Sequence, residues 1–234
     1  MYIMKSIYNK VSLLGAAFLI LQLLFPACTN ELDQYPHVEK TGKDIYTSVD
    51  NYQQVLAKLY GSFVMAGQDK GGGNTDISGS RGFDYMRCYF NLQELGTDEA
   101  AMVWHASDNQ TGLSYLSWDE NDVWVYDTYY RIYYTIALCN EFIRNATDDK
   151  IGTFSESEQQ ELRSMRAEAR FLRALAYSHA LDLFRDIPFL DESSPVGTYC
   201  PPKHTAQQIY DYIVSELSVV AKALPQHPEY PRAG

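Results

Sequence analysis

An uninterrupted helical pattern that begins at Ser155 limits most strongly what this chain can fold into. No glycine or proline interrupts the pattern before Pro188, and apolar residues recur at intervals of three and four, as on one face of an α-helix. Ser155 and Glu158 have the spacing of a capping box, which places the start of the helix there. So long an amphipathic helix needs other helices to cover its apolar stripe. The stripe consists of Leu162, Met165, Ala169, Leu172, Leu175, Ala176, His179 and Leu183.

Three further helices are predicted by the same periodicity. They occupy residues from about 48 to 66, from about 121 to 144, and from 205 to 224, where Thr205 and Gln208 form a second capping box. Alanines along the helix that follows Ser155 let a neighbouring helix come close. The sequence therefore predicts an all-α fold of antiparallel helix pairs, joined by loops of unequal length.

Two polar features within these helices resemble metal sites, but a structural interpretation is preferred for both. His179 lies on the apolar stripe without a recognisable metal-ligand motif, so it is predicted to be a hydrogen-bonded core histidine. Asp119, Glu120 and Asp122 lie at the start of the second long helix and lack the alternating ligands of a calcium loop. They are interpreted as acids that favour a helix N-terminus. No metal and no cofactor is expected.

The N-terminus has the pattern of an export signal. Lys5 and Lys10 precede an apolar run over residues 11–25, which is too short to span a bilayer because a spanning helix needs about 20 residues. The run ends at Ala27-Cys28, which resembles the lipobox of bacterial lipoproteins. We predict a signal peptide over residues 1–27, a lipid anchor on Cys28, an extended leader over residues 28–45 and a helical body over residues 46–234. A soluble exported protein with a buried Cys28 is the alternative.

The other three cysteines are Cys88, Cys139 and Cys200, and no two of them have the C-x-x-C spacing. An odd number predicts neither a disulfide framework nor a zinc site. One disulfide with a free thiol and three buried thiols both stay open.

Charge and aromatic content narrow the class of ligand. The chain has 19 basic and 30 acidic residues, so it repels phosphate backbones and nucleic acid is not expected as a partner. Aromatic residues make up 14% of the chain. Tyrosine and tryptophan offer flat apolar faces with a polar edge, which suit sugars.

The segment before the second long helix combines loop composition with many rings. Residues 70–82 are rich in glycine and predict a flexible loop. Residues 83–118 show no sustained period and are predicted to be irregular, with rings that either anchor the loop to the core or form a binding surface. Those rings are Phe83, Tyr85, Tyr89, Phe90, Trp104, Tyr115 and Trp118.

Several sequence blocks together resemble the SusD/RagB family of glycan-binding lipoproteins. They are Glu94-Leu95-Gly96-Thr97-Asp98-Glu99, Trp124 with Tyr130, Ile136-Ala137-Leu138-Cys139-Asn140, Glu168-Ala169-Arg170-Phe171-Leu172-Arg173-Ala174, and Leu183-Phe184-Arg185-Asp186-Ile187-Pro188. The resemblance implies tetratricopeptide-like helix pairs that support an irregular, loop-rich face. It also implies a protein anchored by lipid in the outer membrane at the cell surface, which binds oligosaccharides and is not an enzyme. Its implied partner is a TonB-dependent transporter of the SusC type, to which it delivers the glycan.

The resemblance is strongest to starch-binding members of the family, which implies an α-glucan ligand. Trp104 matches a tryptophan that stacks on the sugar, and Arg87 matches an arginine that bonds sugar hydroxyls. Ser107 replaces an asparagine that contacts sugar, and its hydroxyl can donate in place of the amide. Asn109 is the alternative donor. Family members continue beyond the position of Gly234, so the chain is expected to be the N-terminal part of a longer fold.

Two alternatives to glycan binding stay open. A helical-repeat protein can act as a scaffold for protein partners. A glycoside hydrolase needs two carboxylates across a cleft, and 30 acidic residues allow such a pair. The chain has neither an H-E-x-x-H nor a G-x-S-x-G motif, however. The hydrolase is therefore the weaker alternative.

Overall fold

The computed structural model describes residues 42–66, 84–103, 112–197 and 200–224. In this part of the chain, helices account for nearly all of the regular structure, and from α3 onward they belong to one compact unit. The elements are α2 (Gly42–Ile45), α3 (Val49–Gly61), α4 (Tyr85–Glu94), α5 (Val123–Asn145), α6 (Asp148–Ile151), α7 (Glu156–Phe184), β1 (Ile187–Pro188), β2 (Lys203–His204) and α8 (Ala206–Ala223). The predicted all-α class is confirmed.

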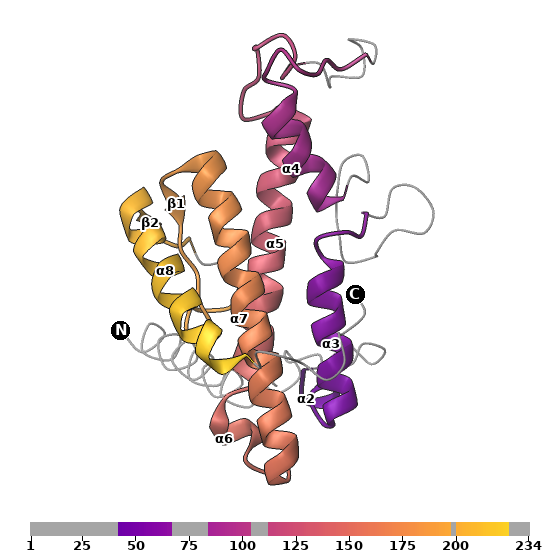
Figure 1. Ribbon diagram of the computed structural model, residues 1–234, viewed down its shortest axis with the longest axis vertical. Coiled ribbons are helices and arrows are strands. Elements are labelled where there is room, and N and C mark those ends of the chain that lie inside the picture. The colour runs from indigo at the N-terminus through magenta and orange to yellow at the C-terminus, as the bar shows by residue number, and fades with distance from the viewer. Residues whose placement is uncertain (1–41, 67–83, 104–111, 198–199, 225–234) are drawn as a thin grey trace, which may run out of the picture. The chain divides into compact units, whose positions relative to one another are not determined.

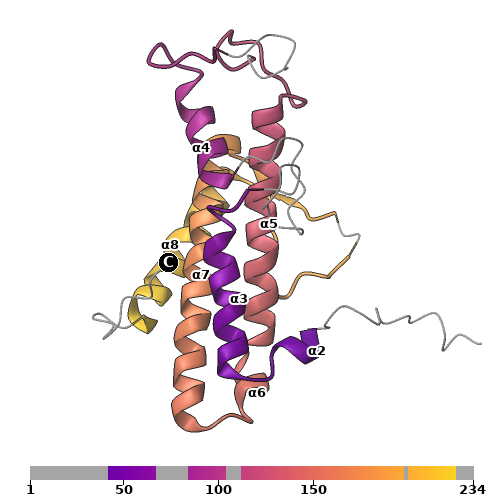
Figure 2. The same ribbon diagram turned by 90° about the vertical axis from the view of Figure 1, so that its right-hand side faces the viewer.

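Helix α7 is the central element of the bundle. It packs against α3, α5 and α8, and Figures 1 and 2 both show it alongside these helices. Arg166, in the first half of α7, donates to the Ala146 carbonyl at the end of α5. Arg173, later in α7, donates to Asn140, which lies earlier in α5. The helices α5 and α7 are therefore antiparallel, as predicted.

Both predicted capping boxes are present. The Ser155 backbone N–H donates to Glu158 Oε2 at 2.9 Å, at the start of α7. The Thr205 backbone N–H donates to Gln208 Oε1 at 2.8 Å, and Thr205 Oγ1 accepts from the Gln208 backbone N–H at 3.3 Å. These bonds satisfy N–H groups that have no partner inside the helix. They explain why α7 and α8 begin where the sequence predicts.

The main core fills the space between α3, α5, α7 and α8. Small residues on α7 let the neighbouring helices approach, since Ala169, Ala176 and Ala180 are fully buried. Aromatic rings fill the core near the start of α3 and the end of α5, where the Tyr52 and Phe142 rings meet edge to face with centroids 5.8 Å apart. The largest buried members of this core are Tyr52, Leu56, Leu59, Tyr85, Ile132, Ile136, Phe142, Ile151 and Tyr177.

The prediction that residues 83–118 are irregular is wrong for α4. Asp84 caps this helix by accepting a hydrogen bond from the Arg87 backbone N–H at 2.8 Å. The apolar period of α4 is blurred in the sequence because Phe90 is exposed while the polar Asn91 is buried. Packing against α5 therefore decided a local structure that composition did not reveal.

The connection from α7 to α8 is built by a short antiparallel ladder. Arg185 ends α7 with a positive φ of 62°, a conformation that turns the chain away from the helix axis. β1 then pairs with β2, which directly precedes α8. Asp186 Oδ1 accepts a hydrogen bond from the Ala206 backbone N–H at 2.8 Å. The sequence block at residues 183–188 thus fixes the start of α8.

Several N-terminal predictions lie outside the described residues. Residues 1–41, which include the predicted signal peptide and Cys28, are among them. The last residues of the predicted extended leader form the helical turn α2. None of the helices that the structure describes combines the length and hydrophobicity needed to cross a bilayer.

Cys88 and Cys139 are buried free thiols, whereas Cys200 is a free thiol exposed to solvent. Both arrangements left open by the sequence, one disulfide with a free thiol and three buried thiols, are therefore wrong.

Candidate functional site

A second, smaller hydrophobic cluster joins the end of α4 to the start of α5. Its buried members are Cys88, Leu95, Leu113 and Trp124. Ala100 and Met102 pack against it from the segment that follows α4. The cluster therefore holds both sides of the segment between the two helices, which is the segment with the predicted site residues.

The Glu94–Glu99 block forms the exit from α4. Leu95 is buried in the second cluster, and Thr97 Oγ1 donates to the Glu94 carbonyl at 2.7 Å. The same hydroxyl accepts a hydrogen bond from the Glu99 backbone N–H at 3.2 Å. The threonine therefore builds a local turn. This block positions the following segment, and its role in the structure is architectural.

Trp104, Ser107 and Asn109 lie outside the described residues, but both sides of their segment are described. The Met102 backbone N–H donates to Ser114 Oγ at 2.9 Å. This bond ties the two sides together, and Met102 and Leu113 both contact the second cluster. The segment that contains the predicted binding residues therefore begins and ends at a fixed base.

Arg87 is the predicted site residue that the structure describes. It is exposed on α4, and its guanidinium carbon lies 5.8 Å from the centroid of the Trp124 ring. A cation over an indole face is attracted to the ring. Trp124 is fully buried in the second cluster. The same cluster thus supports Arg87 and the base of the segment with Trp104.

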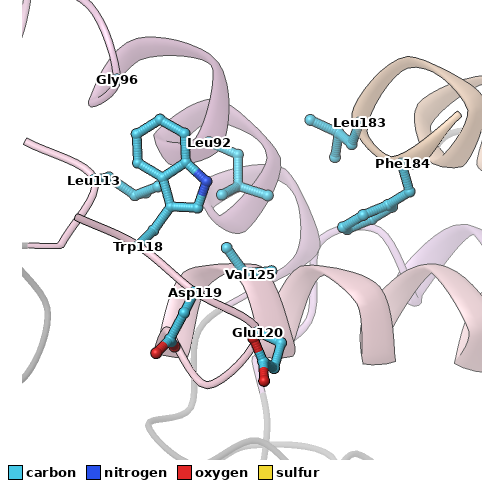
Figure 3. A pocket seen from close by; sticks show the side chains of 9 residues that line it. All are labelled: Leu92, Gly96, Leu113, Trp118, Asp119, Glu120, Val125, Leu183 and Phe184. Carbon is cyan, nitrogen blue, oxygen red and sulfur yellow. The ribbon is translucent and has the colours of Figure 1, made fainter. Parts of the chain in front are cut away.

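A cavity of about 510 Å³ lies beside this base. Figure 3 shows the Trp118 indole at one side of it, with Leu183 and Phe184 reaching it from α7. Its walls are mostly apolar. Asp119 and Glu120 lie at one edge, and their exposed carboxylates point away from the apolar side chains in Figure 3. The lining residues are Leu92, Gly96, Leu113, Trp118, Asp119, Glu120, Val125, Leu183 and Phe184.

A tight turn holds Trp118 in this position. The Ser117 backbone N–H donates to the Gly112 carbonyl at 2.9 Å. A Cβ added at Gly112 would lie 2.5 Å from Asp122 Oδ2, so the Asp122 side chain would have to shift. Asp122 in turn caps α5, since its Oδ1 accepts from the Trp124 backbone N–H at 2.9 Å. The interpretation of Asp122 as an N-terminal acid of the second long helix is confirmed.

The cavity was missed by sequence reasoning. From the sequence, Trp118 is predicted to be one ring of an irregular segment. Leu183 belongs to the predicted apolar stripe, and Leu183 and Phe184 belong to a family block. Residues of three separate helices meet at the cavity, and no periodicity within one helix reports such a meeting. The sequence feature that could have indicated the cavity is Trp118-Asp119-Glu120, in which a tryptophan is followed by two acidic residues.

His179 has the structural role predicted for it. Its Nδ1 is hydrogen-bonded to the Tyr85 hydroxyl at 2.8 Å, and it lies half-buried on α7. Burial lowers its pKa below the ordinary value, although Asp182 acts in the opposite direction. Across the described ranges, no group of three or more histidine, cysteine, aspartate or glutamate side chains is placed to hold a metal ion.

Two of the family blocks meet in a buried polar network between α5, α7 and α8. Arg173 donates to Asn140 Oδ1 at 2.7 Å, to Glu192 Oε2 at 2.5 Å and to Glu216 Oε1 at 3.0 Å. Arg170 adds two bonds to the Glu216 carboxylate, at 2.8 and 2.6 Å. These blocks therefore connect helices, and they do not face the cavity.

The electrostatics of the network follow from these contacts. Burial acts to raise the pKa of Glu216, but hydrogen bonds and ion pairs with Arg170 and Arg173 outweigh it and hold that pKa below its ordinary value. Glu216 therefore stays ionised inside the bundle.

The described structure is a helix bundle with a buried arginine network between its helices and a second cluster at the base of the segment with Trp104. The family described as "Starch-binding associating with outer membrane" matches residues 39–233. This chain belongs to that SusD-like family, which confirms the resemblance inferred from the sequence blocks. The starch-binding protein SusD of Bacteroides thetaiotaomicron is 30% identical over 219 residues, which are 93% of this chain and 37% of that relative.

Solved structures share the fold. A SusD superfamily protein from Bacteroides vulgatus has a TM-score of 0.61 at 15% identity, over 79% of this chain and 36% of that one. Surface glycan-binding protein A from Bacteroides uniformis has a TM-score of 0.57 at 20% identity, also over 79% of this chain and 36% of that one. This chain thus spans little more than a third of the length of these relatives.

Proposed function

We propose that this protein captures oligosaccharides at the cell surface and delivers them to a TonB-dependent transporter of the SusC type. α-Glucan is the favoured ligand. The observation that carries the proposal is the 30% identity to the starch-binding SusD, because it extends over 93% of this chain. A lipid on Cys28 would hold the protein at the outer membrane, in agreement with the family description.

The proposed binding step uses Trp104 as a flat apolar seat for a hexose. Arg87 supplies a fork of N–H donors to the sugar hydroxyls. Two features of the described residues support this assignment: Arg87 is exposed on α4, and the base of the segment with Trp104 is tied by the bond between Met102 and Ser114. A segment with a fixed base loses less conformational entropy when it binds a ligand. Ser107 or Asn109 would add a further hydrogen bond.

The affinity for one short oligosaccharide is expected to be weak. Each ring contact contributes on the order of 1 kcal/mol, and the gain comes from several contacts along one polymer. Weak binding suits a protein that passes its ligand on. No catalytic step is proposed, so incubation with starch should yield no new reducing ends. New reducing ends would favour the hydrolase instead.

The test of sugar capture is native affinity electrophoresis in gels that contain amylopectin. Trp104→Ala is expected to abolish the retardation seen for the natural protein, while Trp104→Phe retains part of it because a ring remains. Arg87→Ala should weaken retardation more than Arg87→Lys, which keeps the charge. Circular dichroism checks that the helices are unchanged. Equal retardation of Trp104→Ala and the natural protein would overturn the assignment.

The anchor and the partner have separate tests. Cys28→Ser is expected to release the protein from the outer-membrane fraction, because acylation needs the thiol. Co-purification from a detergent-solubilised outer membrane is expected to recover a TonB-dependent transporter with the natural protein. Failure of the second experiment would leave glycan capture intact and would remove the delivery step.

A further inference from the structure

The cavity beside Trp118 has the chemistry of a sugar site, and its described lining residues include none of the glycan-binding residues that the resemblance implies. Its volume of about 510 Å³ lies within the range of small-molecule sites in proteins. We infer that this cavity is a second saccharide-binding subsite, with Trp118 and Phe184 as ring contacts and Asp119 and Glu120 as acceptors for hydroxyl groups. The inference rests on the proposed function, because it assigns a further contact for the same glycan.

The division between apolar walls and a polar edge fits a pyranose. A pyranose ring has two faces of C–H groups, and its hydroxyls point outward around the ring. In the cavity, the Trp118 indole, Val125 and Phe184 form apolar walls. Asp119 and Glu120 lie at one edge, with their carboxylates exposed to solvent and pointing outward, where the hydroxyls of a bound sugar would also point. An ionised carboxylate accepts hydrogen bonds from hydroxyls and does not donate any.

Both rings are held in place before a ligand arrives. The turn from Gly112 to Ser117 positions Trp118, which remains 49% exposed and so keeps a free surface for a ligand. The Phe184 ring meets the Tyr129 ring edge to face, with centroids 5.4 Å apart. Rings that are already ordered lose little conformational entropy on binding.

The cavity lies beside residues that flank the segment with Trp104. Leu113 lines the cavity and belongs to the cluster that holds the base of the Trp104 segment. When one glycan chain contacts both Trp104 and the cavity, the second contact is intramolecular and adds to the affinity without a further loss of translational and rotational entropy. The subsite should therefore matter more for a long glycan than for a short one.

The first experiment compares Trp118→Ala with Tyr115→Ala in the amylopectin gel. Tyr115 is a matched control, because its ring is 71% exposed on the same segment and does not line the cavity. Trp118→Ala is expected to weaken binding roughly three- to tenfold, as the loss of one ring contact predicts, and Trp118→Phe to restore most of it. Tyr115→Ala should bind like the natural protein. Thermal unfolding of each variant checks that the fold is kept.

The second experiment observes the cavity directly. The chain has three tryptophans, and Trp124 is fully buried. In a Trp104→Phe variant, Trp118 is therefore the accessible indole, and maltoheptaose is expected to change its fluorescence in a saturable way. Glu120→Gln should reduce the apparent affinity, because an amide is a weaker acceptor than a carboxylate.

The outcomes separate the subsite from the proposed function. If the natural protein is retarded and Trp118→Ala behaves like Tyr115→Ala, the subsite is overturned and glycan capture stands. If neither amylopectin nor maltoheptaose binds the natural protein, the proposed α-glucan function fails and the subsite fails with it. If Trp118→Ala loses a co-purified transporter but keeps full retardation, the cavity serves protein docking and the sugar assignment is wrong.

Discussion

The contact between α7 and α8 and the end formed by α4 and α5 use polar side chains in opposite ways. At the first, Arg173 and Glu216 are buried and bonded to each other inside the bundle. At the second, the interior is an apolar cluster, while Arg87, Asp119 and Glu120 stay exposed around it. The buried ion pair joins two helices and so fixes the architecture. The exposed charges lie beside rings, and under the proposed function they contact the ligand.

The largest effect is expected where the buried charge network is broken. Arg173→Ala removes one hydrogen-bond partner from each of Asn140, Glu192 and Glu216 and should lower the free energy of unfolding by about 3–5 kcal/mol. Urea denaturation followed by circular dichroism measures this change. Arg163→Ala is the control, because its pair with Asp148 lies at the surface, and it should cost about 1 kcal/mol or less. Similar losses in both variants would contradict the contrast between the two regions.

The same network predicts a dependence of stability on pH. The folded-state pKa of Glu216 lies below its ordinary value, so its stabilising contribution is present above the unfolded pKa of about 4.3 and is lost as the pH falls through the folded pKa. Glu216→Gln should therefore be about 2 kcal/mol less stable than the natural protein at pH 7, and the difference should shrink in acid. Urea denaturation between pH 7 and pH 3 measures it. A difference that stays constant would show that Glu216 is not held ionised by its arginines.

A smaller effect is expected at the α4–α5 end. Gly112→Ala places a Cβ against Asp122 and should disturb the N-cap of α5, at a cost of about 1 kcal/mol. It should also shift Trp118 and weaken retention by amylopectin. Gly61→Ala is the control, because a Cβ there meets the flexible Met65 side chain at 3.2 Å and Gly61 does not line the cavity. Thermal unfolding and the affinity gel provide both measurements, and equal behaviour of the two variants would argue against a tightly held Trp118.

The smallest effect concerns the thiols. Burial raises the pKa of Cys88 and of Cys139 to about 12, whereas Cys200 is exposed. Among these three, a maleimide reagent at pH 8 is expected to label Cys200 in the folded protein, and to reach the other two only in urea. Labelling at Cys200 should change the free energy of unfolding by less than about 0.5 kcal/mol. Peptide mass spectrometry identifies the modified residue, and rapid labelling of Cys139 would contradict the packing of the main core.

The long helices could be predicted because their information is local. The stripe from Leu162 to Leu183 and the capping boxes at Ser155 and Thr205 each lie within one helix, so spacing alone reveals them. Helix α4 could not be predicted in the same way, since Phe90 is exposed and Asn91 is buried. That exchange of apolar and polar positions is decided by α5, which lies far along the chain.

In the candidate site too, the sequence indicated some residues, while others are brought together by contacts between distant parts of the chain. The resemblance to the family drew attention to Arg87, and the structure describes it as exposed on α4 beside the second cluster. The cavity depends on contacts between Trp118 and two residues of α7, Leu183 and Phe184. A sequence pattern within any one of these elements contains no information on their meeting. The roles of Trp104, Ser107 and Asn109 remain predictions.

The bond between Met102 and Ser114 also bears on how such a protein could diversify. Because residues on both sides of 104–111 are tied to each other and to the second cluster, we expect replacement of these eight residues to leave the helices unchanged. Under the proposed function, insertion of the matching residues of a relative that binds another glycan would change the specificity and leave the yield of folded protein the same.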